Sequence, residues 1–140
     1  TLRTLFPYTT LFRSDYWHFY LHIGLERKIS IIRYRYKGKA IIYIIRNTVT
    51  GMLYVGSTLS ASLRFYHHFI ARDVSKSNAN LQHAIATDGI EAFNLYIMQE
   101  VVFPSGLDYN DKLNFLHGVE QRYMDKYPKD QLYNKVNSSS

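Results

Sequence analysis

Two short apolar stretches separated by a polar turn form the clearest pattern along the chain. They cover residues 41–45 and 53–55, and both are rich in the β-branched and aromatic residues that favour strands. Residues 47–51 between them have the composition of a short hairpin loop. The pattern therefore predicts a β-hairpin that places Tyr43 and Tyr54 on facing strands, within about one register step of each other.

Beyond the hairpin, apolar residues recur at helical spacing in three stretches and alternate with polar residues in one. Leu81 and Ile85 indicate the inner face of the second helix, and Gly89 is its expected stop. The elements that these patterns predict are helices over 60–70 and 78–88, a strand over 93–102 and a helix over 110–126.

The predicted order of elements, β-β-α-α-β-α, fits one small domain. Three strands and three helices favour an α+β fold, in which a small three-stranded antiparallel sheet is flanked by about three helices. We expect this domain to cover residues 40–135, followed by a short tail over 136–140.

The first 39 residues differ in character from the rest of the chain. Residues 1–14 lack helical or strand periodicity and read like translated sequencing adaptor, with a transit peptide as the alternative. Residues 15–39 form a basic aromatic extension. This extension either offers a surface for single-stranded nucleic acid or is poorly folded and out of place, with an extra strand over 29–36. Because the first methionine is Met52, inside the hairpin, we expect the chain to be a fragment or an artificially opened reading frame.

Composition narrows the classes of function. The chain has no cysteine, which excludes disulfides, zinc ribbons and thiol catalysis. It has no apolar run long enough for a membrane span, so we expect no membrane partner. The net charge of +6 is carried entirely by residues 1–39, and residues 40–140 hold nine basic and nine acidic residues. Bulk charge therefore gives little support to DNA binding by the domain, which must depend on local groups such as Arg64.

The first predicted helix carries two cationic or titratable groups on one face. Arg64 and His68 are four residues apart, so they share a face that can meet a ligand. We expect His67 to pack on the apolar face instead. That face is predicted to consist of Leu63, Tyr66 and Ile70.

The last predicted helix carries an acidic residue within its apolar stripe. That stripe consists of Leu113, Leu116, Val119, Tyr123, Met124 and Tyr127. Burying an unpaired carboxylate is costly, so Glu120 must pair with a cation such as Arg64 or Arg122, bind a metal, or form the wall of a site. His117 lies one turn earlier, but no further ligands complete a dedicated zinc site.

The two hairpin strands carry motifs that resemble those of the GIY-YIG nuclease family. The motifs stand here as Ile41-Ile42-Tyr43 and Tyr54-Val55-Gly56, with Ile41 in place of the family's leading glycine. The resemblance covers the predicted domain and implies the same α+β architecture. The catalytic residues that it implies are Tyr43, Tyr54, Arg64, His68, Glu120 and Asn134.

The resemblance implies a metal-dependent endonuclease that hydrolyses double-stranded DNA. Glu120 would bind Mg²⁺ or Mn²⁺, and Arg64 would hold the phosphoryl oxygens. Tyr43 would activate or orient the attacking water, with Tyr54 and His68 supporting proton transfer.

Four further residues have expected structural roles. Asn47 would organise the hairpin turn, and Gly51 would supply a position with positive φ. Gly56 would allow the backbone to approach the helix or the substrate. The resemblance implies that Asn134 supports the site by hydrogen bonding.

Intron-encoded homing endonucleases of fungal mitochondria resemble this chain most, which implies a mitochondrial location. Two alternatives stay open. One is a catalytically silent nucleic-acid-binding or intron-associated remnant, and the other is a repair-type nuclease that incises branched DNA.

Overall fold

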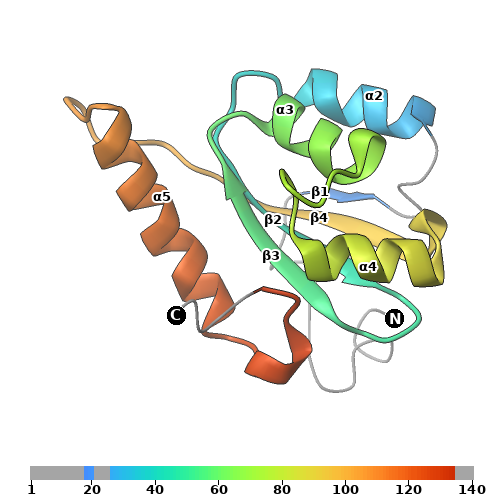
Figure 1. Ribbon diagram of the computed structural model, residues 1–140. Coiled ribbons are helices and arrows are strands. Elements are labelled where there is room, and N and C mark those ends of the chain that lie inside the picture. Colours follow the sequence, from blue (N-terminus) through green and yellow to red (C-terminus); the bar gives the residue numbers. More distant parts are fainter. Residues whose placement is uncertain (1–17, 21–25, 135–140) are drawn as a thin grey trace.

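The computed structural model describes residues 18–20 and 26–134 (Figure 1). The elements in chain order are β1 His18–Tyr20, α2 Glu26–Arg35, β2 Ile41–Asn47, β3 Leu53–Thr58, α3 Ala61–Phe65, the π-helix Tyr66–Ala71, α4 Ala79–Asp88, a 3₁₀ turn Ile90–Ala92, β4 Phe93–Glu100, α5 Tyr109–Met124 and a 3₁₀ turn Lys129–Gln131. The predicted segments 1–14 and 136–140 lie outside the described residues. Within the described residues, no helix has the length and apolarity that a membrane crossing requires.

The sheet confirms the predicted α+β class and its three antiparallel strands. Strand β2 lies in the middle, with β3 on one side and β4 on the other, and both pairings are antiparallel. The short strand β1, which was not predicted, pairs with β4 and extends the order to β1-β4-β2-β3. Strand β3 therefore forms one edge of the sheet.

Helices cover both faces of this sheet (Figure 1). The side chains of Ile41, Tyr43 and Ile45 pack with α2, α3 and α4 on one face. Those of Ile42 and Ile44 pack with α5 on the other. Burial on both faces explains why β2 reads as a continuous apolar run instead of alternating with polar residues.

The segment that we expected as an extra strand over 29–36 is helical, so that prediction was wrong. Helix α2 and the turn that follows it bury Ile29, Ile32 and Tyr36 in the same core as the hairpin tyrosines. These three residues recur at three- and four-residue intervals, which is the spacing of a helix face. The β-branched and aromatic content of the segment concealed this period. The extension is thus folded onto the domain over the described residues.

The helix after the hairpin buries a different face from the one predicted. Ala61, Phe65 and Phe69 are buried, whereas Leu63, Tyr66 and Ile70 are exposed. Both sets have helical spacing, so the pattern alone could not choose between them. The backbone also widens to a π-helix after Phe65, which shifts later residues around the axis relative to an α-helix.

Helices α4 and α5 lie where the periodicity placed them. Asn78 caps α4 by accepting from the Leu81 N–H at 2.9 Å, and Gly89 ends the helix at φ +86°. Asp108 caps α5 by accepting from the Asp111 N–H at 2.8 Å. The predicted inner residues of both helices are buried or half-buried, at Leu81, Ile85, Leu113, Leu116, Val119, Tyr123, Met124 and Tyr127.

Candidate active site

The two hairpin tyrosines lie on the same face of the sheet as diagonal neighbours. Tyr43 faces Gly56 in the β2–β3 ladder, and Tyr54 faces Ile45, so the two are two positions apart along the strands. Their ring centroids are 6.2 Å apart. The pairing of β2 with β4 shifts register between Ile42 and Tyr43, a bulge of the kind often found beside functional sites.

Gly56 is required by the Tyr43 ring. A Cβ atom at position 56 would overlap the ring carbons of Tyr43. Within the protein the close neighbour of Gly56 is thus the Tyr43 side chain and not the helix, and an approach by substrate stays a prediction. On its other side the Tyr43 ring packs edge-on against Phe65, with centroids 5.0 Å apart. Tyr43 is therefore held in one position by its surroundings.

His68 is fully buried behind Tyr43, which corrects the prediction that it lies on a face open to ligand. Its Nε2 lies 2.6 Å from the Tyr43 hydroxyl, and its Nδ1 lies 2.6 Å from the Ser77 hydroxyl. Burial, the Arg64 charge and His67 hold the pKa of His68 well below its usual value. His67, expected on the packed face, is only half-buried.

Arg64 is fixed by two hydrogen bonds. Its Nη2 donates to the Tyr54 hydroxyl at 3.0 Å and its Nη1 donates to the Lys76 carbonyl at 2.7 Å. Burial lowers the pKa of Arg64, but its interactions with Tyr43 and Tyr54 outweigh this and raise the pKa above its usual value. A charged guanidinium therefore stands next to both phenols.

Both phenols are neutral in this arrangement. Burial raises the pKa of Tyr43 well above its usual value, and Tyr54 raises it further, while Arg64 opposes both effects. The pKa of Tyr54 is raised by burial and lowered in part by Arg64. The phenolate form thus needs additional positive charge nearby.

Glu120 approaches the same place from the opposite layer. It is half-buried on α5 and accepts a hydrogen bond from the Ser57 hydroxyl on β3. Burial raises the pKa of Glu120, while Ser57, His117 and Arg64 lower it. Arg122, one of the expected partners, is exposed. Tyr43, Tyr54, Arg64 and His68 together form what we call the tyrosine cluster. Because β3 is the edge strand, the Glu120 carboxylate from the α5 layer can reach the side of this cluster.

The donors present fit a magnesium-type ion and not a preformed protein cage. Within the described residues, no group of three His, Asp or Glu side chains could hold a metal. Mg²⁺ is commonly held by only one or two carboxylates, with water and substrate phosphate completing its shell. Glu120, half-buried and hydrogen-bonded by the Ser57 hydroxyl, is a carboxylate of the kind that could act as such a ligand.

Asn134 and Asn47 support the sheet and do not enter the tyrosine cluster. The Asn134 side chain accepts from the Val55 N–H at 3.0 Å and donates to the Val55 carbonyl at 2.7 Å. Asn47 organises the hairpin turn by accepting from the Val49 N–H at 2.9 Å. Its amide also donates to Asp88 and Tyr133, which ties the turn to α4 and the C-terminal segment. Gly51, in the turn, has the expected positive φ of 80°.

Three residues near the cluster were missed from the sequence, namely Ser57, Ser77 and Gln82. Ser57 follows the second motif directly, so its place beside the site could have been inferred from the hairpin register. Ser77 and Gln82 meet His68 only through tertiary packing, and common polar residues on a loop and a helix give no signal of that.

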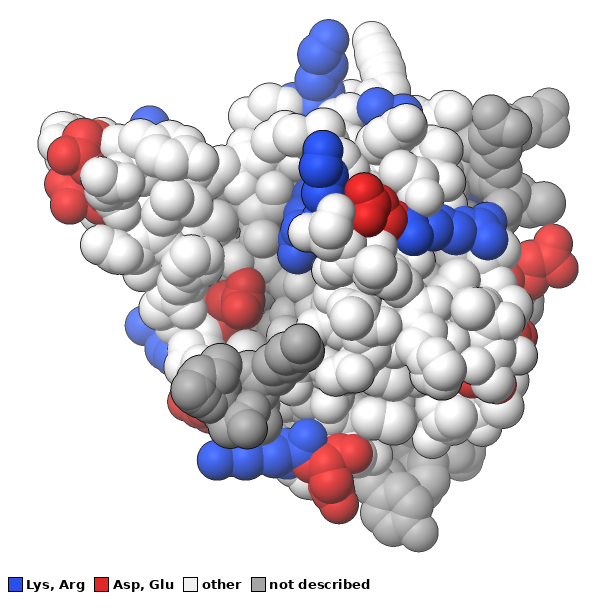
Figure 2. Space-filling model, viewed as in Figure 1, with Lys and Arg blue, Asp and Glu red and all other residues white. Residues whose placement is uncertain are grey.

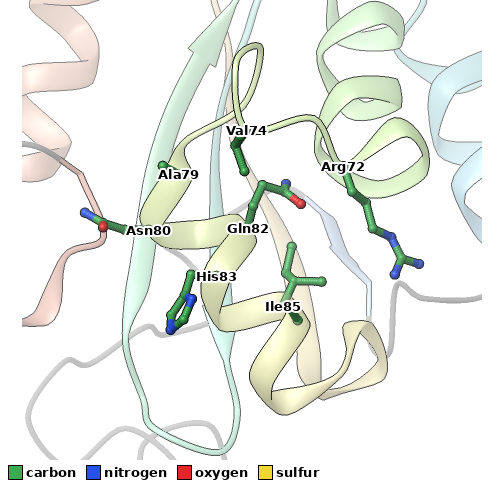
Figure 3. Close-up of a pocket in the computed structure, with 8 residues that line it drawn as sticks. Arg72, Val74, Ala79, Asn80, Gln82, His83 and Ile85 are labelled. Atoms are coloured by element: carbon green, nitrogen blue, oxygen red, sulfur yellow. The ribbon is translucent and has the colours of Figure 1, made fainter.

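A separate hollow of about 670 Å³ lies beside α4 (Figure 3). Arg72 and Val74 approach from the segment before α4, and Asn80, His83 and Ile85 project from the helix itself. Gln82, whose side chain donates to the His68 carbonyl, is among the residues that line this hollow. None of the predicted catalytic residues lines it.

Charge is distributed in small groups over the face seen in Figure 2. Lys and Arg side chains on this face are interrupted by Asp and Glu and form no continuous basic surface. The same view shows an open notch between α5 and the rest of the molecule. Attraction of a polyanion by this face therefore depends on separate small groups of basic side chains.

Comparisons with known proteins identify the family of the chain and agree with its fold. Residues 39–134 match the GIY-YIG catalytic domain. The catalytic domain of the homing endonuclease I-TevI superposes with a TM-score of 0.55 at 22% identity, over 71% of this chain and 100% of that one. A mutant of the catalytic domain of intron endonuclease I-TevI gives a TM-score of 0.55 at 21% identity, over 72% and 97%. No curated protein matches the chain significantly.

Proposed function

Since this chain belongs to the GIY-YIG catalytic domain family and is a nuclease acting on phosphodiester bonds, we propose that it is a divalent-metal-dependent endonuclease that hydrolyses double-stranded DNA. One observation carries the proposal. Two buried phenols, a guanidinium and a carboxylate gather around one edge strand although they come from four separate elements. These are the groups needed to bind a phosphate, hold a hard cation and position water.

Arg64 is the phosphate-binding group of this proposal. Its guanidinium is anchored at Nη1 and Nη2, so its charge stays next to the tyrosines. A delocalised cation in a partly dehydrated site stabilises the charge that develops on phosphoryl oxygens in the transition state.

Glu120 would hold Mg²⁺ or Mn²⁺, which when bound supplies positive charge to the phosphate and the leaving oxygen. The Ser57 hydroxyl on β3 orients the Glu120 carboxylate by donating a hydrogen bond to it. The pKa of Glu120 is raised because burial removes water from the carboxylate. A cation bound there would compensate for the lost hydration of the negative charge.

Tyr43 would position and activate the attacking water. In the free protein it is a neutral phenol, so its first role is to orient the water by hydrogen bonding. Arg64 already favours the phenolate form, and a cation bound nearby would favour it further. Tyr54 holds Arg64 in place and completes the polar wall of the site.

Nicking of supercoiled plasmid tests the proposal. The chain should nick plasmid with Mg²⁺ or Mn²⁺, and chelation should stop the reaction. We expect Arg64→Ala and Glu120→Ala each to lose roughly 100-fold or more in rate. Arg122→Ala and Asp111→Ala are matched controls, because both residues are exposed on α5 and should leave the rate unchanged. Nicking by the two site variants at the parent rate would disprove the assignment, and absence of nicking by the parent would favour a silent nucleic-acid-binding remnant.

We further propose that the chain is part of an intron-encoded homing endonuclease and acts in mitochondria. The similarity to the catalytic domains of a homing endonuclease and an intron endonuclease supports the first part. The neutral charge of residues 40–140 is consistent with a domain that relies on another region for target affinity. The genomic sequence on both sides of this reading frame tests the proposal, since an organellar intron should surround it. A preference for flaps or bubbles over plain duplex would instead favour a repair-type nuclease.

A further inference from the structure

The loop between the π-helix and α4 brings Lys76 next to the proposed phosphate-binding group. Arg64 Nη1 donates to the Lys76 carbonyl at 2.7 Å, so the backbone of Lys76 lies directly against the guanidinium. The Lys76 side chain is exposed and takes no part in that hydrogen bond. The proposed function therefore leaves the charge of this ammonium unused.

The backbone of Lys76 is held in place from both sides. The Lys76 N–H and the Ser77 N–H both donate to the Asp73 carbonyl, at 3.0 Å and 2.8 Å. Ser77 Oγ lies 2.6 Å from His68 Nδ1 and 2.9 Å from Gln82 Nε2. Figure 3 shows this loop joining the end of the π-helix to α4. A side chain on a fixed backbone loses less entropy when it binds a ligand, so Lys76 is prepared for a contact beside Arg64.

The Lys76 ammonium is not neutralised by a salt bridge. Within the described residues the ion pair closer than 4 Å is Lys39 with Glu100, and Lys76 forms none. Asp73, the acidic residue of the loop, accepts from the N–H and the hydroxyl of Ser75 at 2.9 Å and 2.8 Å. These hydrogen bonds lower the pKa of Asp73 more than the Lys76 charge does. The charge of Lys76 thus remains available to an anion from outside.

The elements that surround Arg64 bring no acidic residue to this place. Between positions 27 and 72 the chain has no Asp or Glu. The same stretch has nine basic residues, namely Arg27, Lys28, Arg33, Arg35, Lys37, Lys39, Arg46, Arg64 and Arg72. It includes β2, β3, α3 and the π-helix, so these elements add no negative charge that would repel a polyanion at Arg64.

DNA offers more than one phosphate to such a place. Successive phosphates of one strand follow each other at about 3.4 Å along the helix axis, so a group that binds one phosphate has others close by. Lysine suits a second contact, because its ammonium is a compact charge on a flexible four-carbon stem. We propose that Lys76 is a substrate-binding residue whose ammonium binds a DNA phosphate neighbouring the one at Arg64. The proposal rests on the proposed function, since it takes DNA as the substrate.

Binding of a short DNA duplex, followed by fluorescence anisotropy without divalent metal over a range of salt concentrations, tests this contact. Lys76→Gln removes the charge and keeps the carbonyl that Arg64 uses. We expect it to weaken binding roughly threefold or more at low salt, and to reduce the slope of log K against log salt by about 0.9. An unchanged slope would overturn the proposal. No binding by the parent would overturn it as well, and would also contradict DNA as the substrate.

Two further variants control for charge and position. Lys129→Gln removes another exposed lysine, which lies in the 3₁₀ turn beyond the lower end of α5, away from the loop before α4 (Figure 1). It should keep the parent affinity and slope. Lys76→Arg keeps the charge and should keep them too. An equal loss in Lys129→Gln and Lys76→Gln would show an effect of net charge alone and would overturn the proposal.

Nicking kinetics separate a phosphate contact from a role in positioning Arg64. We expect Lys76→Gln to raise KM for plasmid roughly threefold or more and to change kcat by less than about twofold, whereas Arg64→Ala loses kcat. Parent values of both constants in Lys76→Gln would assign to Lys76 its carbonyl contact only and overturn the proposal. A fall in kcat with KM unchanged would overturn it too, because the variant would then have disturbed Arg64. The anisotropy measurement needs no cleavage, so failure to nick plasmid and failure of this contact are distinguishable.

Discussion

The contact between Gly56 and the Tyr43 ring makes position 56 intolerant of any side chain. We expect Gly56→Ala to displace the ring, lower the free energy of unfolding by about 1–3 kcal/mol and reduce nicking. Urea unfolding and plasmid nicking measure the two effects. Gly118→Ala is the control, since a Cβ there meets open space on α5 and should stabilise the helix by about 0.5–1 kcal/mol. An unfolding midpoint for Gly56→Ala equal to that of the parent would contradict the assigned packing.

Buried His68 makes stability depend on pH in a defined direction. Its folded pKa is depressed, so the unfolded state binds more protons once the pH falls below the ordinary histidine value of about 6.5. Stability is therefore complete above that value and falls below it, by at most about 1.4 kcal/mol per pH unit. Unfolding measured between about pH 5 and 7 should show this slope in the parent, and His68→Gln should lack it. The same slope in both proteins would count against a buried neutral histidine.

The contribution of Glu120 to stability should depend on pH in the opposite direction. Its folded pKa is raised, so the contribution of its protonated form is lost as pH rises from the unfolded glutamate value through the folded one. Glu120→Gln keeps the size and the Ser57 contact without the charge. We expect it to raise Tm at neutral pH by about 2–4 °C while nicking is lost, with a smaller gain near about pH 4. Thermal unfolding without divalent metal provides the measurement, and a lower Tm at neutral pH would contradict the cost of burying this charged carboxylate.

The site residues that could be predicted are those whose residue type and spacing constrain each other. Tyr43 and Tyr54 follow from the hairpin register, and Glu120 stands out because an acid interrupts an apolar stripe. Ser77 and Gln82 could not be found in this way. Their contacts to His68 are set by how the π-helix packs on α4, which local periodicity does not encode.

At the scale of elements, the buried face of α3 and the π-helix can be tested by paired truncations. Phe69 is buried and its neighbour Ile70 is exposed. We expect Phe69→Ala to cost about 3–5 kcal/mol, whereas Ile70→Ala should change stability by less than about 0.5 kcal/mol. Chemical unfolding of the two variants distinguishes the faces, and a reversed order would restore the face first predicted from the sequence.

Prediction of elements succeeded where one signal dominated. The hairpin, α4 and α5 each combine a clear period with a cap or turn residue, such as Gly51, Asn78 or Asp108. It failed where two signals competed. In α2 the strand-favouring composition masked a helical period, and in α3 two apolar faces left the choice to tertiary contacts.

At the scale of the whole molecule, α2 adds to the core although it precedes the matched catalytic domain. Ile32 is fully buried and Ile31 is largely exposed. We expect Ile32→Ala to lower the free energy of unfolding by about 2–5 kcal/mol and Ile31→Ala to have almost no effect. Equal, small effects in thermal or urea unfolding would show that α2 does not pack on the domain in solution.

The edge strand β3 carries Tyr54 and Ser57, and its outer backbone groups are occupied by the C-terminal segment. The Tyr133 N–H bonds the Leu53 carbonyl, and the Asn134 amide satisfies both backbone groups of Val55. An open strand edge invites pairing with the same strand of another copy. Asn134 therefore occupies, at Val55, the backbone groups through which the strand that lines the active site could pair with a strand of another copy.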